Sequence, residues 1–263
     1  MSDDAVILTQ DGPVATLLLN RPEKLNALDE SEQRGLAEAI ATVAHDPSIR
    51  AAVITGAGRG FCTGGDIQTM ADLKAHHHSA KFRAHLEAGN NVVHAIRRLP
   101  IPVLASVNGP AAGAGLSLAL ACDLRIASDH ATFRQAFLQI GLHPDWGGAF
   151  FLPRHVGIGR AMEMFFLGEP VNAAEAHRIG LVNFVAPHDQ LALETRKLAE
   201  RLAAVPALPV SLLKEALYER LETQLDSMME HEVQAQMNCF KSEDFAEGLQ
   251  AFLEKRKPHF KGR

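Results

Sequence analysis

The sequence predicts an α/β fold followed by a helical C-terminal region. Up to Val185, short apolar runs that end at glycine-bearing loops alternate with segments of helical periodicity, a pattern typical of a sheet covered by helices. From Leu191 onward only helical patterns remain. With 263 residues, 47% of them hydrophobic and 22% charged, the chain has room for one globular core and a smaller appendage.

The first elements are predicted to be a hairpin and a helix. Residues 6–9 and 14–19 are apolar or β-branched runs separated by Asp-Gly-Pro, which indicates two strands joined by a turn. Asp29 followed three residues later by Glu32 has the form of a capping box. Apolar residues then recur at helical spacing, so we expect a helix over residues 30–45.

Two compact apolar runs in the middle of the chain predict buried strands. Ala51 to Thr55 and Val103 to Val107 each end just before a glycine-bearing loop, as strands of a parallel sheet commonly do. Residues 80–98 between them have helical periodicity, and prolines at positions 100 and 102 end that helix.

The C-terminal region is predicted to contain four helices, over residues 191–202, 210–225, 228–240 and 243–255. The last of them carries a stripe of apolar side chains. We expect this stripe to dock on the core or on another subunit, because a terminal helix would not leave it in water. The stripe consists of Phe245, Leu249, Phe252 and Leu253.

Composition excludes several classes of partner. A net charge of -5 and a pI near 6.2 argue against nucleic acid, which requires clustered Lys and Arg. Three widely spaced cysteines without a CxxC pair indicate neither a disulfide framework nor a zinc site. The N-terminus lacks a signal-peptide pattern, and no apolar run is long enough to span a membrane. We therefore expect a cytoplasmic protein with no membrane partner.

Two glycine-rich loops are candidates for binding an anion. Neither fits the dinucleotide-binding fingerprint, because Phe61 and Leu118 stand where its last glycine is needed. Gly64-Gly65 precedes a predicted helix that Asp66 is expected to cap, and Gly113-Ala114-Gly115 precedes another. Helix starts expose backbone N–H groups to anions, although glycine also serves simply to end strands and permit close packing.

Three longer motifs resemble the enoyl-CoA hydratase/isomerase superfamily, also called the crotonase family. They are NRPEKLNAL at 20–28, GRGFCTGGD at 58–66 and the run from Val107 to Asp123, followed by GLHPD at 141–145 and FLEKR at 252–256. The similarity covers essentially the whole chain. It implies a crotonase-like ββα spiral core over residues 1–200 that binds an acyl-CoA thioester, and a helical domain over residues 201–263 that assembles a homotrimer or hexamer.

The resemblance also implies roles for individual residues. The backbone N–H groups of Gly65 and Ala114 would form an oxyanion hole for the thioester carbonyl, where they stabilise the negative charge of an enolate. No separate cofactor and no metal are implied, because coenzyme A is part of the substrate. The residues expected to contact substrate are Lys24, Leu25 and Ala27 in the coenzyme A groove, Lys255 from a neighbouring subunit, and Gly64, Ile67, Phe137 and Trp146.

The reaction type depends on the carboxylates. Hydratases of this family use two glutamates, and motif alignment places Ser117 and Phe137 at those positions, so hydration is disfavoured. Asp145 stands instead where dienoyl-CoA isomerases and epoxyphenylacetyl-CoA isomerases carry an essential aspartate. The surrounding sequence is most similar to the latter group, which favours an isomerase.

Two interpretations of Asp145 remain open at this stage. It could cap a short helix that follows it, a common position for aspartate. It could also be an acid and base, because a carboxylate beside Leu142 and Trp146 would be partly desolvated and its pKa raised. We predict the second role: Asp145 removes a proton from the acyl chain and returns it two carbons away.

Other functions are weaker candidates. A divergent hydratase remains an alternative, as does an aryl-CoA dehalogenase, although the partner His and Trp positions of the dehalogenase correspond here to Asn90 and Phe137. A hydrolase that uses Ser117 lacks a recognisable base. The adjacent His76, His77 and His78 cannot form the HxxxH pair that binds a metal.

Overall fold

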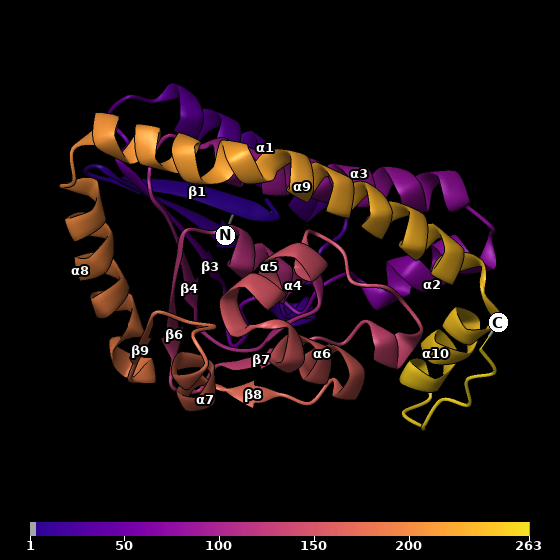
Figure 1. The fold of residues 1–263 in the computed structure, drawn as a ribbon. Coiled ribbons are helices and arrows are strands. Elements are labelled where there is room, and N and C mark those ends of the chain that lie inside the picture. The colour runs from indigo at the N-terminus through magenta and orange to yellow at the C-terminus, as the bar shows by residue number, and fades with distance from the viewer. Residues whose placement is uncertain (1–3, 263) are drawn as a thin grey trace.

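The computed structural model describes residues 4–262, apart from the side chains of Glu219 and Arg220. Its core is a six-stranded sheet with the strand order β1-β2-β3-β4-β6-β9 (Figure 1). β1 and β2 are antiparallel, and the later pairs of neighbours in this sheet are parallel. The strands are β1 (Val6–Asp11), β2 (Val14–Leu19), β3 (Ala51–Gly56), β4 (Val103–Val107), β6 (Leu124–Ser128) and β9 (Phe184–Ala186).

The predicted hairpin and first helix are confirmed. Gly12 and Pro13 form the turn between β1 and β2. Helix α1 (Glu30–His45) begins at the predicted capping box, in which the Asp29 carboxylate accepts from the backbone N–H of Glu32 and the Glu32 carboxylate accepts from that of Asp29.

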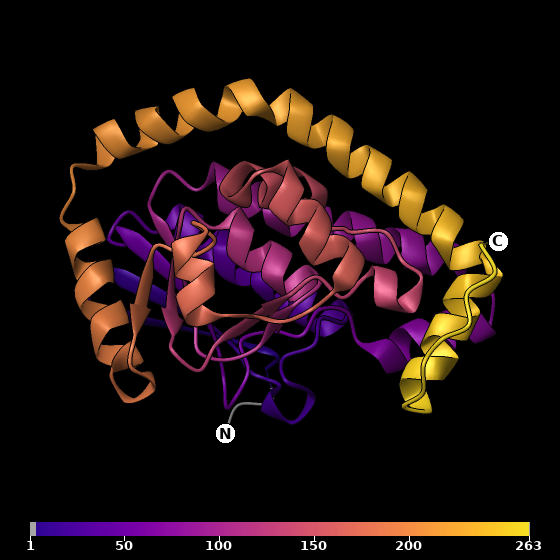
Figure 2. The same cartoon turned by 60° about the horizontal axis from the view of Figure 1, so that its bottom comes forward.

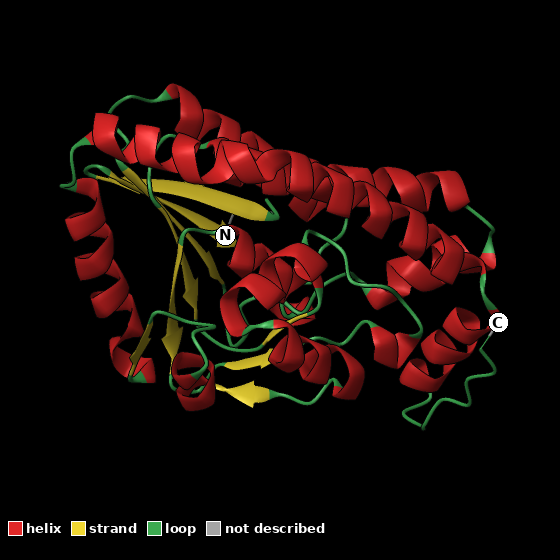
Figure 3. Ribbon diagram, viewed as in Figure 1, coloured by secondary structure: helices red, strands yellow, loops and turns green. Residues whose placement is uncertain are grey.

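Helices cover both faces of the large sheet (Figure 3). Helix α8 (Leu191–Ala203) packs against β2, β3, β4 and β6, and its Leu198 shares a core with Val53 of β3. Helices α1, α3 (Ser79–Arg98) and α4 (Ala114–Ala121) contribute to the larger core on the other side. Because both faces are buried, these strands are continuous apolar runs, as the sequence predicted.

A smaller sheet with the order β5-β7-β8 lies beside the first. The sequence did not indicate it, because strands of two or three residues are too short to show a period. Its strands are β5 (Ala111–Ala112), β7 (Thr132–Arg134) and β8 (Val171–Asn172). The remaining core elements are helices α2 (Ile67–Ala75), α5 (Gly148–Val156), α6 (Ile158–Leu167) and α7 (Ala173–Arg178), and the 3-10 turns η1 (Pro22–Lys24), η2 (Leu138–Ile140) and η3 (His188–Gln190).

The C-terminal region contains one long helix where two were predicted. Helix α9 (Ala207–Lys241) is continuous over 35 residues and arches across the molecule from α8 to α10 (Figure 2). The prediction of separate helices over 210–225 and 228–240 is therefore wrong. The residues at the predicted break, Asp226 and Ser227, have exposed side chains, and the helix continues through them.

The predicted domain boundary between residues 200 and 201 falls inside α8. Since α8 packs on the sheet, we place the end of the core after Ala203 and the start of the helical region at α9. No helix in the described part of the chain is both long and apolar enough to span a bilayer.

The predicted apolar stripe on the last helix, α10 (Glu243–Leu253), docks only in part within one chain. Phe245 and Leu249 are buried in the large core. Phe252 and Leu253 remain 56% and 52% exposed.

Gly89 in α3 is a site where a side chain should destabilise the fold. A methyl group there would lie 2.3 Å from Nε1 of Trp146, which is fully buried. We expect Gly89→Ala to lower the free energy of unfolding by about 1–3 kcal/mol, because overpacking outweighs the roughly 1 kcal/mol that alanine adds in helix propensity. Urea unfolding followed by circular dichroism measures the change.

Gly159→Ala is the matched control. It lies in α6, and apart from its chain neighbours and the backbone of its own helix nothing lies within 4 Å of the added methyl group, so this variant should be at least as stable as the wild type. A Gly89→Ala protein as stable as the Gly159→Ala protein would contradict the close packing of Gly89 against Trp146.

Candidate active site

The residues predicted as the site gather around one cavity of about 510 Å³. Leu25 and Lys255 do not line it: Leu25 lies beside Gly60, and Lys255 is exposed just after α10. Every other residue predicted for the site lines the cavity, namely Lys24, Ala27, Gly64, Gly65, Ile67, Ala114, Phe137, Asp145 and Trp146.

Two backbone N–H groups on the cavity wall are unpaired. Those of Gly65 and Ala114 have no acceptor among the residues that the structure describes. Leu28 forms backbone hydrogen bonds to Gly64 (2.7 Å) and Asp66 (3.0 Å), so the N–H of Gly65 points to the side away from Leu28. Ala114 is the first residue of α4, where an N–H has no intrahelical acceptor. Together the two donors can bind an anionic oxygen.

Glycine is required where the two loops that carry these donors meet. A Cβ at Gly115 would lie 2.1 Å from the carbonyl oxygen of Cys62. Gly64 has a φ of +88°, and a Cβ there would lie 2.9 Å from the carbonyl oxygen of Ala112. The backbone N–H of Ala112 donates to the carbonyl oxygen of Cys62 (3.0 Å), and this hydrogen bond holds the two loops together. Side chains at either glycine would push the two donors apart.

Asp145 lies in the loop between η2 and α5 and lines the same cavity. Its Oδ2 accepts a hydrogen bond from Nε2 of Gln236 (2.9 Å), whereas its Oδ1 is enclosed without a donor in the described part of the chain. Burial raises the pKa of Asp145 to about 7, and the hydrogen bond from Gln236 opposes this increase. A carboxyl group that titrates near neutral pH can both remove and donate a proton.

The alternative role of Asp145 as a helix cap is not seen. Helix α5 begins at Gly148, its cap position is Gly147, and no side chain caps it there. The N–H of Gly148 donates to the backbone carbonyl oxygen of Asp145 (2.9 Å), and those of Gly147 and Ala149 are bound from α9.

Glu232 of α9 binds this helix start and was not identified from the sequence. Its carboxylate oxygens accept from the backbone N–H groups of Gly147 (2.8 Å) and Ala149 (2.9 Å). Burial raises the pKa of Glu232 to about 8, the two hydrogen bonds oppose this, and the nearby Asp145 adds to it. Glu232 does not line the cavity, so it fixes the loop that carries Asp145 to α9.

His85 of α3 is a second titratable group on the wall that the sequence did not indicate. Its Nε2 lies 3.0 Å from Nε2 of Gln33 on α1. Burial lowers the pKa of His85, so its imidazole is neutral at physiological pH. His85 therefore places an uncharged polar ring on the cavity wall.

The rest of the wall beside Asp145 is mainly apolar. Phe137 and Trp146 are 7% and 1% exposed, and Leu142, which is also buried, lines the same cavity. Phe252 of α10 also lines the cavity while remaining half exposed, so the last helix partly covers it from the solvent side. An apolar wall favours a hydrophobic acyl group and keeps the Asp145 carboxyl desolvated.

A cation lies at the solvent side of the cavity. Nζ of Lys24 lies 2.7 Å from Asp66, and the lysine side chain is 43% exposed whereas the aspartate is buried. Asp66 also caps α2 as predicted, by accepting from the backbone N–H of Thr69 (2.9 Å). Both carboxylate oxygens of Asp66 thus have a hydrogen-bond donor.

Other polar residues considered from the sequence do not line the cavity. Ser117 is buried within α4, and its hydroxyl donates to the carbonyl oxygen of Gly113 (3.3 Å). Asn90 lies on α3, and residues 76–78 join α2 to α3. Among the described residues, no three His, Cys, Asp or Glu side chains are grouped so as to hold a metal.

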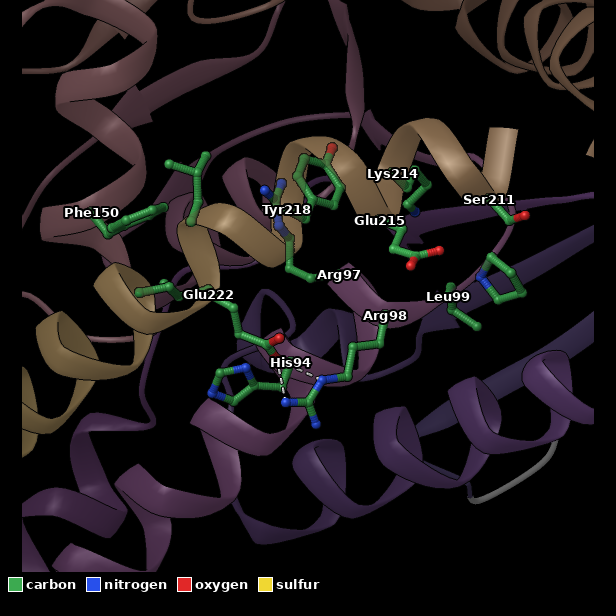
Figure 4. Close-up of a pocket in the computed structure, with 13 residues that line it drawn as sticks. His94, Arg97, Arg98, Leu99, Phe150, Ser211, Lys214, Glu215, Tyr218 and Glu222 are labelled. Carbon is green, nitrogen blue, oxygen red and sulfur yellow. Dashed lines mark hydrogen bonds and ion pairs between the residues drawn. The ribbon is translucent and has the colours of Figure 1, made fainter. Parts of the chain in front are cut away.

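A second cavity of about 360 Å³ lies between α3, α5 and the first half of α9 (Figure 4). Arg98 of α3 forms an ion pair with Glu222 of α9. The guanidinium of Arg97 lies 3.2 Å from the ring centre of Tyr218 on α9. None of the residues predicted for the site lines this cavity. These contacts attach α9 to the core.

Known proteins resemble this chain along its whole length. A family model described as enoyl-CoA hydratase/isomerase matches residues 9–263. The chain is 39% identical over 261 residues to the crotonyl-CoA hydratase of Syntrophomonas wolfei subsp. wolfei, with 99% of both chains covered. It is 39% identical over 251 residues to the 1,2-epoxyphenylacetyl-CoA isomerase of Escherichia coli, with 95% of both covered. The crystal structure of an enoyl-CoA hydratase from Mycobacterium avium subsp. paratuberculosis superimposes with a TM-score of 0.88, 38% identity and 98% of each chain covered.

Asp145→Asn should stabilise the protein at alkaline pH. Folding raises the pKa of Asp145 from 3.8 to about 7, so its stabilising contribution is complete below pH 3.8 and is lost as the pH rises through 7. At about pH 8 the wild type carries a buried charge that asparagine lacks. We expect the variant to have a free energy of unfolding about 1–3 kcal/mol higher there, and nearly equal at about pH 4.

Urea unfolding of both proteins across this pH range tests the expectation. Glu232 titrates in both proteins, and its pKa is raised in part by Asp145, so the difference between them reports Asp145 together with its coupling to Glu232. A difference in stability that is the same at all pH values would contradict the raised pKa.

Proposed function

The chain belongs to the enoyl-CoA hydratase/isomerase family, and we propose that it is an acyl-CoA isomerase in which Asp145 moves the proton. The crotonase-like fold expected from the sequence is confirmed by the structural match. Because the relatives include both a hydratase and an isomerase, the choice between these reactions rests on the residues of the site.

One observation carries the proposal. The cavity brings together two unpaired backbone donors, on Gly65 and Ala114, and one carboxyl group that is free to react, on Asp145. The other described carboxylate on the wall, that of Asp66, is held by Lys24 and a helix start. A single free carboxyl beside an oxyanion hole suits a reaction that moves a proton and adds no water.

In the proposed mechanism, Asp145 takes a proton from the acyl chain as a C–H bond breaks. The electron pair passes into the thioester carbonyl, whose oxygen becomes anionic and is bound by the N–H groups of Gly65 and Ala114. The protonated carboxyl then returns the proton two carbons away, and the double bond is shifted. An isomerisation that opens a ring epoxide would use the same groups.

The residues at the two glutamate positions of the hydratases argue against hydration. Ser117 is turned into its own helix and does not line the cavity, and Phe137 places an aromatic ring on the wall. The buried Glu232 does not replace them, because both of its oxygens bind backbone N–H groups. Among the described residues, no second carboxylate is therefore placed to activate water.

Dehalogenation is also less well supported. Asn90, at the position of the histidine partner, does not line the cavity. Phe137 supplies an aromatic ring but no N–H donor at the position of the tryptophan. The neutral His85 lines the wall from the same helix, yet it lies at a different position from the family histidine.

We assign the remaining wall residues to substrate binding. Lys24 and Ala27 would face the coenzyme A portion, with Leu25 contributing from its edge. Gly64, Ile67, Phe137 and Trp146 would contact the thioester and acyl group. Lys255 lies outside the cavity of its own chain, so its proposed contact with the phosphates would be made from a neighbouring subunit.

We also propose that the helical region assembles copies of the chain into a trimer or hexamer. The first half of α9 exposes a run of leucines, and α6 exposes a second apolar row that starts at Ile158. A patch of this kind usually marks an interface. The exposed leucines of α9 are Leu208, Leu212, Leu213 and Leu217.

The isomerase proposal predicts a new chromophore when the protein is mixed with a 3-enoyl-CoA, because the double bond moves into conjugation with the thioester. Asp145→Asn should lower kcat by at least about 10³-fold, since it removes the acid and base and keeps the shape of the cavity. Ultraviolet absorbance measures the rate, and the affinity for coenzyme A should change little. Turnover by Asp145→Asn at the wild-type rate would exclude this mechanism.

The same assay separates isomerisation from hydration. With a 2-enoyl-CoA, a hydratase would cause the conjugated chromophore to disappear, whereas the proposed isomerase would leave it largely intact. Rapid hydration that survives in Asp145→Asn would establish the alternative function.

The assembly proposal predicts that Leu212→Glu combined with Leu217→Glu yields a smaller particle. Charges placed in an apolar interface carry a desolvation cost that no partner offsets. Light scattering measures the mass. Thr223→Glu combined with Ser227→Glu, at two exposed polar positions of α9, is the control for the same added negative charge. An unchanged mass for the leucine variant would show that these leucines are not at the interface.

A further inference from the structure

We propose that Gln236 of α9 is the positioning residue for Asp145, and that Oδ1 of Asp145 is the atom that takes and returns the substrate proton. This inference rests on the proposed isomerase function. It assigns a catalytic consequence to the helical region, in addition to assembly.

The geometry distinguishes the two oxygens of the carboxyl group. Gln236 is fully buried, and its Nε2 donates to Oδ2 of Asp145 over 2.9 Å. Oδ1 is enclosed and has no donor in the described part of the chain. One oxygen is thus held by the protein, and the other is left for a group that enters the cavity.

An amide is well suited to hold a carboxyl group that must change its charge. A lysine or arginine in the same place would favour the carboxylate so strongly that the pKa would fall far below neutral. Gln236 donates a hydrogen bond without carrying a charge and cannot take the proton itself. Asp145 is therefore oriented in both protonation states while it remains able to titrate near neutral pH.

The proton transfer can then be written for particular atoms. A C–H bond of the acyl chain breaks as an O–H bond forms at Oδ1 of Asp145, and the electron pair moves to the thioester oxygen. In the second step the O–H bond at Oδ1 breaks and a C–H bond forms two carbons away. Oδ2 stays hydrogen-bonded to Gln236 throughout, so the carboxyl group does not need to rotate.

Glu232 and Gln236 act from successive turns of α9. They are four residues apart, which places both side chains on one face of the helix. Glu232 fixes the backbone of the loop through Gly147 and Ala149, and Gln236 fixes the carboxyl group that the loop carries. The position and the orientation of Asp145 therefore both depend on α9.

Several other titratable groups surround Asp145, and their charges also affect its pKa. Burial of the carboxyl is the main cause of its raised pKa, and Gln236 opposes it. The surrounding groups are Glu232 from α9, His85 from α3, His143 in the same loop with His231 against it, and Lys24, Asp66 and Arg134 on the cavity wall.

Gln236→Met tests the proposal, because methionine has nearly the same length and volume but no N–H donor. Loss of the donor destabilises the carboxylate, so the acidic limb of the kcat profile should move up by about one pH unit. At neutral pH kcat should fall about 10- to 100-fold, because the carboxyl group is no longer oriented. KM should change by less than about twofold, since Gln236 does not line the cavity.

Gln234→Met is the matched control. It makes the same substitution two residues away on the exposed side of α9, and its kcat profile should equal that of the wild type. A Gln236→Met protein with lower stability but an unshifted profile and an unchanged kcat would overturn the positioning role.

A second measurement does not depend on turnover. Titration of ¹³C-labelled aspartate by NMR, with the Asp145 signal identified by its loss in Asp145→Asn, reports the pKa directly. The proposal requires a higher pKa in Gln236→Met than in Gln234→Met, and equal values would overturn it. If the pKa rises as expected but the wild type isomerises no 3-enoyl-CoA, Gln236 still holds Asp145 and lowers its pKa, whereas the isomerase function and the proton transfer at Oδ1 fail.

Discussion

The site depends on two backbone N–H groups remaining unpaired inside a folded chain. The N–H of Gly65 stays unpaired because the chain around it is held by two isolated β-bridges. Gly65 pairs with Leu28 in one of them, and Cys62 pairs with Ala111 in the other. Each bridge uses neighbouring backbone groups and leaves the N–H of Gly65 free. A backbone donor without an acceptor costs free energy where it is shielded from water, and an anionic oxygen of a bound ligand would remove that cost.

The long helix α9 provides the side chains that hold the loop carrying Asp145. The loop that carries Asp145 has no capping side chain of its own, and Glu232 satisfies its backbone from 83 to 85 residues away. Gln236 reaches the carboxyl group of Asp145 from 91 residues away. The region that we propose to assemble the subunits therefore also holds the loop that carries Asp145, from outside the cavity.

The sequence predicted the parts of this protein that are encoded locally. The glycine loops, the capping box at Asp29 and the strands β3 and β4 follow from short patterns, and the motif resemblance led to Asp145. The sequence could not reveal Gln236 or the role of Glu232, because a glutamine and a glutamate on a mixed helix look like ordinary surface residues until the packing of α9 is known. The continuity of α9 was missed for a related reason: the residues around Asp226 and Ser227 do not show locally whether the chain turns there, and the structure shows that the helix continues through them.

Trp146 gives the cavity a property that its chemistry does not require. It is the sole tryptophan of the chain, and it lies fully buried on the wall next to Asp145. The indole emission of the whole protein thus comes from this one position, without a background from elsewhere. Occupation of the cavity, ionisation of the neighbouring carboxyl and displacement of α3 at Gly89 would all change the surroundings of the same ring, so the molecule carries its own optical reporter of the site.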